Sequence, residues 1–468
     1  MLCYIHSLFR WGKESRSCKA NRPYSQHSVQ WMLHDCKAIQ IWVAQKAREA
    51  EDQKLDNKLD PSLANFQRVV CDDPTLSRLA DNMFTEASAR YPLDPEEQPA
   101  IQSFQQFLQV VNVIMQSGPE FYDKPGSDNA MGFVGFPINA LLDWPMGTKS
   151  GHEFFRRRDV NEALKDVLNT WAKFLGTTAS KPCLRGWLSP LGRGMLADQA
   201  NAGRAERYSF QQLFVCPDAG DEKYLGFGSW DAFFTRRFRD GVRHVENPDG
   251  HSHGADAGNT LVVTNACESA PLRVVADVKL RDNFALKGQP YSLVDMLNDN
   301  PLAPGFAGGT VYQAFLNALS YHRWHAPVSG TVVGVEMVPG TYYSESGHEG
   351  LAGNPGDPDS RAPNRSQAYI SAVATRGIIY IRARSPEIGL MAIVFVGMAE
   401  VSSCEFTVGV GDAVVKGQEI GMFHFGGSSH CLVFRPGVRL RFVGRQPPWD
   451  CEHEENNRVN SALAVVRA

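Results

Sequence analysis

Apolar side chains in the first half of the chain recur at intervals of three and four residues. Two stripes of this kind are formed by Ile101, Phe104, Leu108, Val111 and Met115, and by Val160, Leu164, Val167, Trp171 and Phe174. Such intervals place side chains on one face of an α-helix. The pattern predicts a mainly helical region before about residue 250.

The pattern changes after the segment Asn247–Gly258, whose Pro, Gly, His and Asp residues predict a linker. Short runs rich in strand-forming residues then follow, at Leu261–Thr264, Gly330–Val335, Ile378–Ala383 and Met391–Val396. A Gly-, Pro- and Asp-rich segment, Tyr343–Arg365, is predicted to be a surface loop or lid. We therefore expect an α+β fold, with a helical N-terminal region followed by a β-rich domain.

Two short elements with turn glycines, residues 325–333 and 409–421, resemble the barrel-sandwich modules that carry biotin or lipoate. Lys416 lies between Val415 and Gly417 rather than between two methionines, which does not favour cofactor attachment. An uncleaved barrel that serves as a binding module remains one alternative.

The composition of the chain excludes several classes of function. The 468 residues exceed what one core usually serves, and 43% hydrophobic with 21% charged residues is typical of globular proteins. A net charge of -4 does not indicate the clustered Lys and Arg residues that bind nucleic acid. The longest apolar run, Leu390–Met398, is too short to cross a bilayer, and residues 1–10 do not have the pattern of a secretory signal. Ten cysteines without a C-x-x-C pair indicate neither a zinc site nor a disulfide framework, so we expect a cytoplasmic protein without a metal.

The most informative segment is residues 423–430, Phe-His-Phe-Gly-Gly-Ser-Ser-His. An isolated Gly-Gly-Ser-Ser is usually only a tight turn. Here apolar runs lead into the turn and out of it, which predicts serines at a buried bend between strands. Gly426 and Gly427 allow backbone angles that let the Ser428 hydroxyl approach the preceding carbonyl. This arrangement predicts self-cleavage between Gly427 and Ser428.

In this hypothesis the Ser428 oxygen attacks the Gly427 carbonyl and an ester replaces the peptide bond. β-Elimination then releases Gly427 as a new C-terminus and leaves dehydroalanine, which loses ammonia to water and becomes a pyruvoyl group. The fragments would be residues 1–427 and 428–468. The ketone could bind a substrate amine and withdraw electrons as a carboxylate leaves, so no external cofactor is expected.

The cleavage needs a base, and residues 321–327, Tyr-His-Arg-Trp-His-Ala-Pro, supply His322 and His325. The two histidines share a face if the stretch is helical and point to opposite faces if it is extended. Glu268 follows a predicted strand and could orient the base, as the acid of a Ser-His-acid triad does. The alternative is that Glu268 pairs with a nearby arginine.

From about Trp230 to the end, the chain resembles the phosphatidylserine decarboxylase family. The shared motifs are Phe233-Phe-Thr-Arg-Arg-Phe-Arg, Leu286-Lys-Gly-Gln-Pro-Tyr-Ser, Tyr321-His-Arg-Trp-His-Ala-Pro, Val396-Gly-Met, Val415-Lys-Gly-Gln-Glu-Ile-Gly-Met-Phe and the Gly-Gly-Ser-Ser turn. The resemblance implies that Ser428 is the pyruvoyl serine, His325 the processing base and His322 the histidine that assists decarboxylation. Glu268 stands where the family has aspartate, and Gly426 and Ser429 flank the cleavage site.

The Gly-Gly-Ser-Ser turn and the segment Ala266-Cys-Glu-Ser269 resemble in particular the fungal branch of L-tryptophan decarboxylases of psilocybin biosynthesis. That closer likeness begins near residue 80. It implies an N-terminal extension over residues 1–79, a helical domain over 80–228 and a catalytic domain over 229–468. The implied substrate is a small, aromatic amino acid such as L-tryptophan, and the alternative is phosphatidylserine. The sequence leaves the oligomeric state open.

Overall fold

The computed structural model describes residues 36–53, 58–89, 100–121, 136–202, 206–249, 259–282, 291–347, 366–400, 403–424, 428–445 and 455–467. The structural statements below concern these residues. Gly426, Gly427, most of the expected loop and part of the expected linker lie outside them.

The predicted helical region is confirmed. The second apolar stripe lies on α7 (Arg158–Leu175), which buries Val160, Leu164, Val167 and Trp171. The first stripe lies on α4 (Phe104–Ile114), where the hydroxyl of Ser103 accepts a hydrogen bond from the Gln106 N–H at 3.2 Å and caps the helix. Ile101 precedes this helix but is buried with it.

The other helices, in chain order, are α1 (Cys36–Asp52), α2 (Pro61–Asp72), α3 (Pro74–Ala89), α5 (Pro137–Leu142), α6 (Lys149–Phe155), α8 (Leu184–Trp187), α9 (Pro190–Ala200), α10 (Phe210–Leu213), α11 (Trp230–Phe234), α12 (Leu293–Met296) and α14 (Gln367–Val373). In the described ranges, 3-10 helices span Pro145–Gly147, Thr178–Cys183 and Ala303–Phe306. Helix α3 runs across the expected boundary at residues 79 and 80. None of the described helices is long and apolar enough to span a membrane.

The described residues of the second half form three antiparallel sheets, in agreement with the predicted β-rich region. The largest has the strand order β2-β3-β11-β7-β6-β5-β9, and the two smaller ones have the orders β4-β10-β8 and β1-β13-β12. The strands are β1 (Val262–Thr264), β2 (Ala270–Val275), β3 (Thr310–Leu316), β4 (Arg323–His325), β5 (Gly330–Val338), β6 (Arg376–Ala383), β7 (Leu390–Gly397), β8 (Ser403–Phe406), β9 (Ala413–Val414), β10 (Glu419–His424), β11 (Ser428–Phe434), β12 (Arg439–Phe442) and β13 (Ala462–Arg467).

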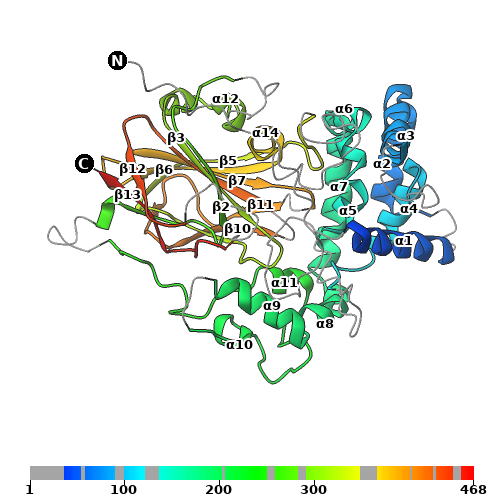
Figure 1. Cartoon of the computed structure of the whole chain (residues 1–468), viewed down its shortest axis with the longest axis horizontal. Helices are drawn as coiled ribbons and strands as arrows, with labels where there is room; N and C mark the ends of the chain where they lie inside the picture. Colours follow the sequence, from blue (N-terminus) through cyan, green and yellow to red (C-terminus); the bar gives the residue numbers. More distant parts are fainter. Residues whose placement is uncertain are drawn as a thin grey trace, which may run out of the picture.

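Aromatic contacts pack the small sheets on the large one. Trp324 on β4 stacks on Phe395 of β7, with ring centroids 3.8 Å apart. Tyr312 on β3 stacks on Phe442 of β12 at 5.7 Å. The small sheets therefore cover the face of the large sheet from which Tyr312 and Phe395 project. Figure 1 shows α12 and α14 near the large sheet and α9, α10 and α11 beyond the small sheets.

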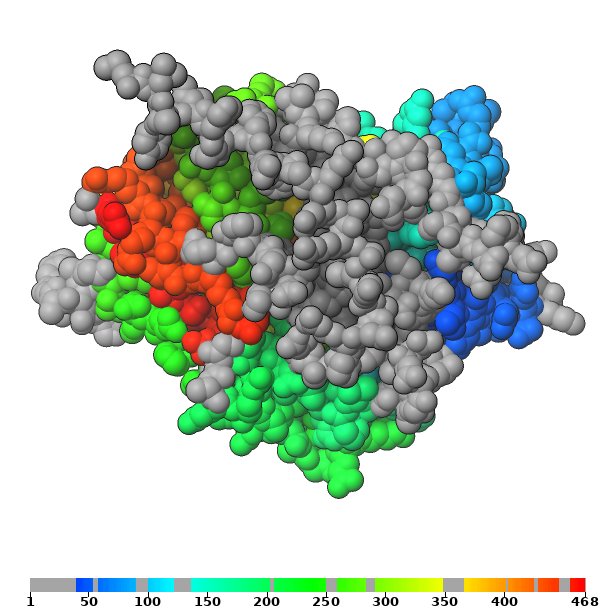
Figure 2. Space-filling view, in the orientation of Figure 1, coloured from blue at the N-terminus to red at the C-terminus, as the bar shows by residue number. Residues whose placement is uncertain are grey.

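Helices α1 to α4 lie at one end of the molecule, and the C-terminal strands lie at the other (Figures 1 and 2). The expected surface loop begins differently from the prediction. Tyr343, Ser344, Glu345 and Ser346 are buried rather than exposed, because they pack where the helical region meets the β-rich region, with the Tyr343 ring 6.0 Å from that of Phe155.

Candidate active site

Ser428 is the first residue of β11, an interior strand of the large sheet. Its ladder partners are Leu316 on β3 and Gly397 on β7. The prediction of strands on both sides of the Gly-Gly-Ser-Ser turn is confirmed, because β10 ends at His424 and β11 begins at Ser428. The two strands belong to different sheets, so residues 425–427 connect one sheet to the other.

The Ser428 hydroxyl is fully buried and has no hydrogen-bond partner among the described residues. Ser429, the next residue, points to the opposite face of the strand. There its hydroxyl accepts a hydrogen bond from the Gln313 amide at 3.3 Å. The strand therefore leaves one serine hydroxyl free for chemistry and satisfies the other.

Both ring nitrogens of His325 are engaged. Nδ1 lies 2.7 Å from the Gly417 carbonyl oxygen, and Nε2 lies 3.0 Å from the Tyr321 hydroxyl. Because a carbonyl only accepts, Nδ1 carries the proton and Nε2 accepts from Tyr321. Burial lowers the pKa of His325 below its ordinary value, although the Gly417 bond opposes this effect. His325 is therefore a neutral imidazole with its lone pair on Nε2, the form that a base requires.

His322 comes directly before β4, so the stretch is extended and the two histidines do not share a helical face. Its ring is fully buried and stacks on Phe234, with centroids 4.2 Å apart. Its carbonyl accepts a hydrogen bond from the Phe423 N–H at 3.0 Å. These contacts fix His322 to β10, the strand that leads to the predicted cleavage site.

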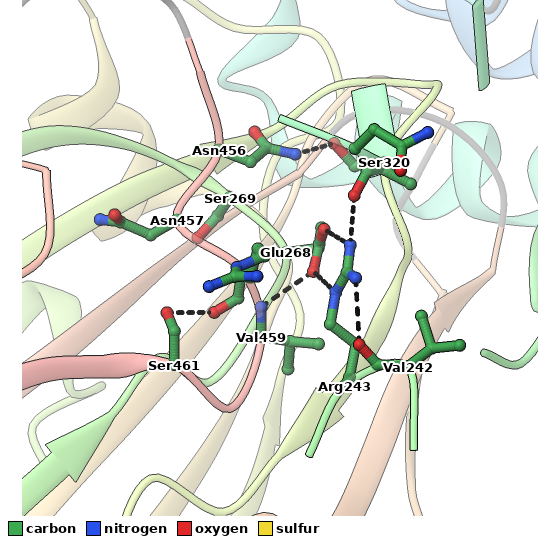
Figure 3. A network of polar contacts seen from close by, with 12 residues as sticks. Val242, Arg243, Glu268, Ser269, Ser320, Asn456, Asn457, Val459 and Ser461 are labelled. Carbon is green, nitrogen blue, oxygen red and sulfur yellow. Dashed lines mark hydrogen bonds and ion pairs between the residues drawn. The ribbon is translucent and has the colours of Figure 1, made fainter. Parts of the chain in front are cut away.

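Glu268 is buried and bound by an arginine (Figure 3). The Arg243 guanidinium donates to both carboxylate oxygens, with Nε 3.0 Å from Oε2. The Val459 N–H donates to Oε2 at 2.8 Å. In the described part of the chain, the side chains of Ser428, His325 and Glu268 form no hydrogen bond with one another. The arginine alternative for Glu268 is thus the arrangement found.

The Phe233-Phe-Thr-Arg motif forms hydrogen bonds with the histidine segment and with the residues just before it. Arg236 is buried between the rings of Phe214 and Phe233, and its Nη2 donates to the Leu319 carbonyl at 2.8 Å. The Arg323 Nε donates to the Thr235 carbonyl at 2.7 Å. The motif is therefore an internal brace rather than an exposed basic helix face.

Three buried polar groups near these elements had no role in the sequence interpretation: Tyr321, His430 and Glu400. Glu400, three residues beyond Gly397, accepts hydrogen bonds from the Ile138 and Asn139 N–H groups at 2.5 and 2.8 Å. Burial raises the pKa of Glu400 to about 7. For Tyr321 and His430, only their places in the sequence could have indicated a role. Tyr321 opens the histidine motif, and His430 follows Ser428 by two residues.

Lys416, the residue considered for cofactor attachment, is internal. Its side chain is 1% exposed and pairs with Asp249 at 2.7 Å. Its Nζ also donates to the carbonyls of Asn247 and Asn259. A buried and fully bonded amine is unsuited to carrying a biotin or lipoate arm.

Comparison with known proteins identifies the family of this chain. Two family models, both described as phosphatidylserine decarboxylase, match residues 60–196 and 230–457. The decarboxylase iboD of Amanita muscaria is 40% identical over 76% of this chain and 99% of its own length. The L-tryptophan decarboxylase of Psilocybe cubensis is 31% identical over 95% of this chain and 96% of its own length, and that of Psilocybe cyanescens is 34% identical over 78% and 83%. The chain therefore belongs to the phosphatidylserine decarboxylase family of carboxy-lyases.

Proposed function

We propose that this protein is a pyruvoyl-dependent decarboxylase that cleaves itself between Gly427 and Ser428 and removes carbon dioxide from a small, aromatic amino acid. L-Tryptophan is the first candidate, because two relatives that align over most of the chain are L-tryptophan decarboxylases. The observation that carries the proposal is the buried, unbonded hydroxyl of Ser428 at the start of an interior strand.

The residues around Ser428 fit a group made from that serine. Gly397, its neighbour on β7, has no side chain to fill the adjacent space. A pyruvoyl group, once formed, supplies a ketone that bonds a substrate amine and withdraws electrons as the carboxylate leaves. Burying an unpaired polar atom costs free energy, so such atoms are rare in protein cores and often have a function, which supports a reactive role for this hydroxyl.

His325 is the proposed base for self-cleavage. Its Nδ1–H is held by the Gly417 carbonyl, which presents the Nε2 lone pair. We propose that the Tyr321 hydroxyl turns away from Nε2, which then takes the Ser428 proton while the Ser428 oxygen bonds to the Gly427 carbonyl carbon. The imidazolium returns this proton to the Ser428 nitrogen as the peptide C–N bond breaks, which leaves an ester. We assign His322 to assisting the decarboxylation. Glu268, held by Arg243, would influence His325 through its charge rather than through a hydrogen bond.

Denaturing electrophoresis and intact-mass analysis of freshly purified protein test the cleavage. We expect two fragments, residues 1–427 and 428–468, with a ketone at the new N-terminus of the smaller one. Ser428→Ala should remain a single inactive chain. The matched control is Ser429→Ala, which should still cleave because that hydroxyl lies on the opposite face. A single full-length band from freshly purified wild-type protein would refute the proposal and favour an uncleaved binding module.

Substrate choice needs a separate assay. We expect carbon dioxide release from L-tryptophan in detergent-free buffer. Activity only with phosphatidylserine vesicles would instead support the second candidate, which the family description favours.

We also propose a cytoplasmic location. In its support, the described cysteines Cys71, Cys183, Cys216, Cys267, Cys404 and Cys431 are free thiols, as is usual in a reducing compartment.

A further inference from the structure

His430 lies on the same face of β11 as Ser428. Side chains alternate between the two faces of a strand, so residues two apart project side by side, about 7 Å from each other. Ser429 and Cys431 project to the opposite face. His430 is therefore the nearest side chain to Ser428 along this face of the strand.

Each member of this pair has one small ladder partner. Gly397 is opposite Ser428 on β7, and Ala314 is opposite His430 on β3. The other partner of His430 is Phe395, which Trp324 covers. The Tyr312 ring meets the His430 ring edge-on, with centroids 6.0 Å apart. The imidazole thus lies against the Tyr312 ring, beside two positions that lack bulky side chains.

The imidazole has no solvent exposure, and neither ring nitrogen has a hydrogen-bond partner among the described residues. Burial lowers the pKa of His430 to about 3, so the ring is neutral at cellular pH. An apolar residue would fill the same space without leaving polar atoms unpaired. A buried, unpaired imidazole next to the reactive serine is therefore better explained by a ligand than by packing.

We propose that His430 is a substrate-orienting residue whose ring N–H donates a hydrogen bond to the carboxylate of the amino acid bound at Ser428. This inference rests on the proposed function and adds to it the group that recognises the carboxylate. The side chain of His430 projects toward the substrate from the strand that carries the reactive residue, so its position is fixed by the sheet.

The neutral state of the ring suits this task. A full positive charge would stabilise the carboxylate before reaction and oppose its conversion to uncharged carbon dioxide. A neutral donor orients the carboxylate and stabilises it less than a full charge would. His430 is not suited to donate a proton, because its low pKa keeps it neutral.

The test uses three variants of the full chain. His430→Val removes the donor, His430→Gln keeps an N–H donor, and Cys431→Val is a matched control on the opposite face of the strand. We expect all three to self-cleave. Borohydride capture on the small fragment, read by mass spectrometry, then compares L-tryptophan with tryptamine, which has no carboxylate.

His430→Val should weaken capture of tryptophan about 10-fold or more, the size expected for a hydrogen bond to a charged group, and leave capture of tryptamine unchanged. His430→Gln should restore much of the loss, and Cys431→Val should resemble wild type. Three outcomes would overturn the role of His430 and leave the proposed function standing. They are equal capture of tryptophan by wild type and His430→Val, an equal loss of capture for both ligands, and a His430→Val chain that no longer cleaves. A wild-type chain that stays whole or captures neither ligand would overturn the proposed function, and this inference with it.

Discussion

Arg243 holds both carboxylate oxygens of Glu268 in a buried ion pair, with 5% and 2% of the two side chains exposed. The pair has an indirect route to His325. The Arg243 guanidinium lies 4.1 Å from the centre of the Phe238 ring, that ring is 4.5 Å from the ring of Tyr321, and the Tyr321 hydroxyl bonds His325. The charge of Glu268 raises the pKa of His325, against the larger effect of burial, which lowers it.

Removing one partner of this pair should destabilise the fold strongly. We expect Arg243→Ala to lower the free energy of unfolding by about 3–5 kcal/mol, because a buried carboxylate loses its counter-charge. Urea unfolding in a Ser428→Ala background, which keeps the chain whole, measures the change. The control is Arg158→Ala, whose partner is Glu162 and whose side chain is 92% exposed, with an expected cost below about 1 kcal/mol. Equal costs for the two variants would contradict this prediction.

Self-cleavage should require neutral His325. Since burial lowers the pKa of this histidine below 6.5, the cleavage rate should be constant above pH 6.5 and fall as the pH drops through the lowered value. Tyr321→Phe removes the hydrogen bond donated to Nε2, which favours the neutral ring, so the acidic limb should move toward higher pH. The rate is measured on electrophoresis gels after cell-free synthesis at buffered pH. An unchanged limb in Tyr321→Phe would argue against His325 as the titrating base.

His424 should stabilise the protein at mildly acidic pH. Its Nδ1 lies 2.7 Å from Asp231, and its Nε2 lies 2.8 Å from Glu405. Burial lowers the pKa of His424, but the two carboxylates outweigh it and raise the pKa above 6.5. A raised histidine pKa contributes stability below 6.5, and that contribution is lost as the pH rises through the folded value.

We therefore expect His424→Gln to be about 1 kcal/mol less stable than wild type at pH 6 and equally stable at pH 9. Urea unfolding at both pH values, again in the Ser428→Ala background, provides the measurement. A difference of the same size at both pH values would show that His424 acts through packing alone.

Local patterns predicted most of the elements. The runs at residues 330–335, 378–383 and 391–396 lie within β5, β6 and β7, because their β-branched and apolar residues suit a buried sheet. Both apolar stripes lie on helices, because intervals of three and four residues place the apolar side chains on one buried face. The resemblance carried by short motifs predicted the family to which the comparisons assign the chain.

Contacts between distant segments could not be predicted in this way. The partner of Glu268 is Arg243, at the far side of the expected linker, and no local pattern marks that pairing. The segment from Tyr343 to Ser346 contains small and polar residues that are typical of a loop, yet it is buried because the helical region packs beside it. The importance of His430 also depends on the register of β11, which sets the face to which each side chain points.

The place of β11 between β3 and β7 has a consequence for the two-fragment enzyme that we propose. Residues 428–468 would supply an interior strand of the large sheet as well as β12 and β13, so their release would break the ladders on both sides of β11 at once. The two fragments would then behave as one inseparable, non-covalent heterodimer. Dissociation of the smaller chain would amount to global unfolding, and the reactive end group would last as long as the sheet itself.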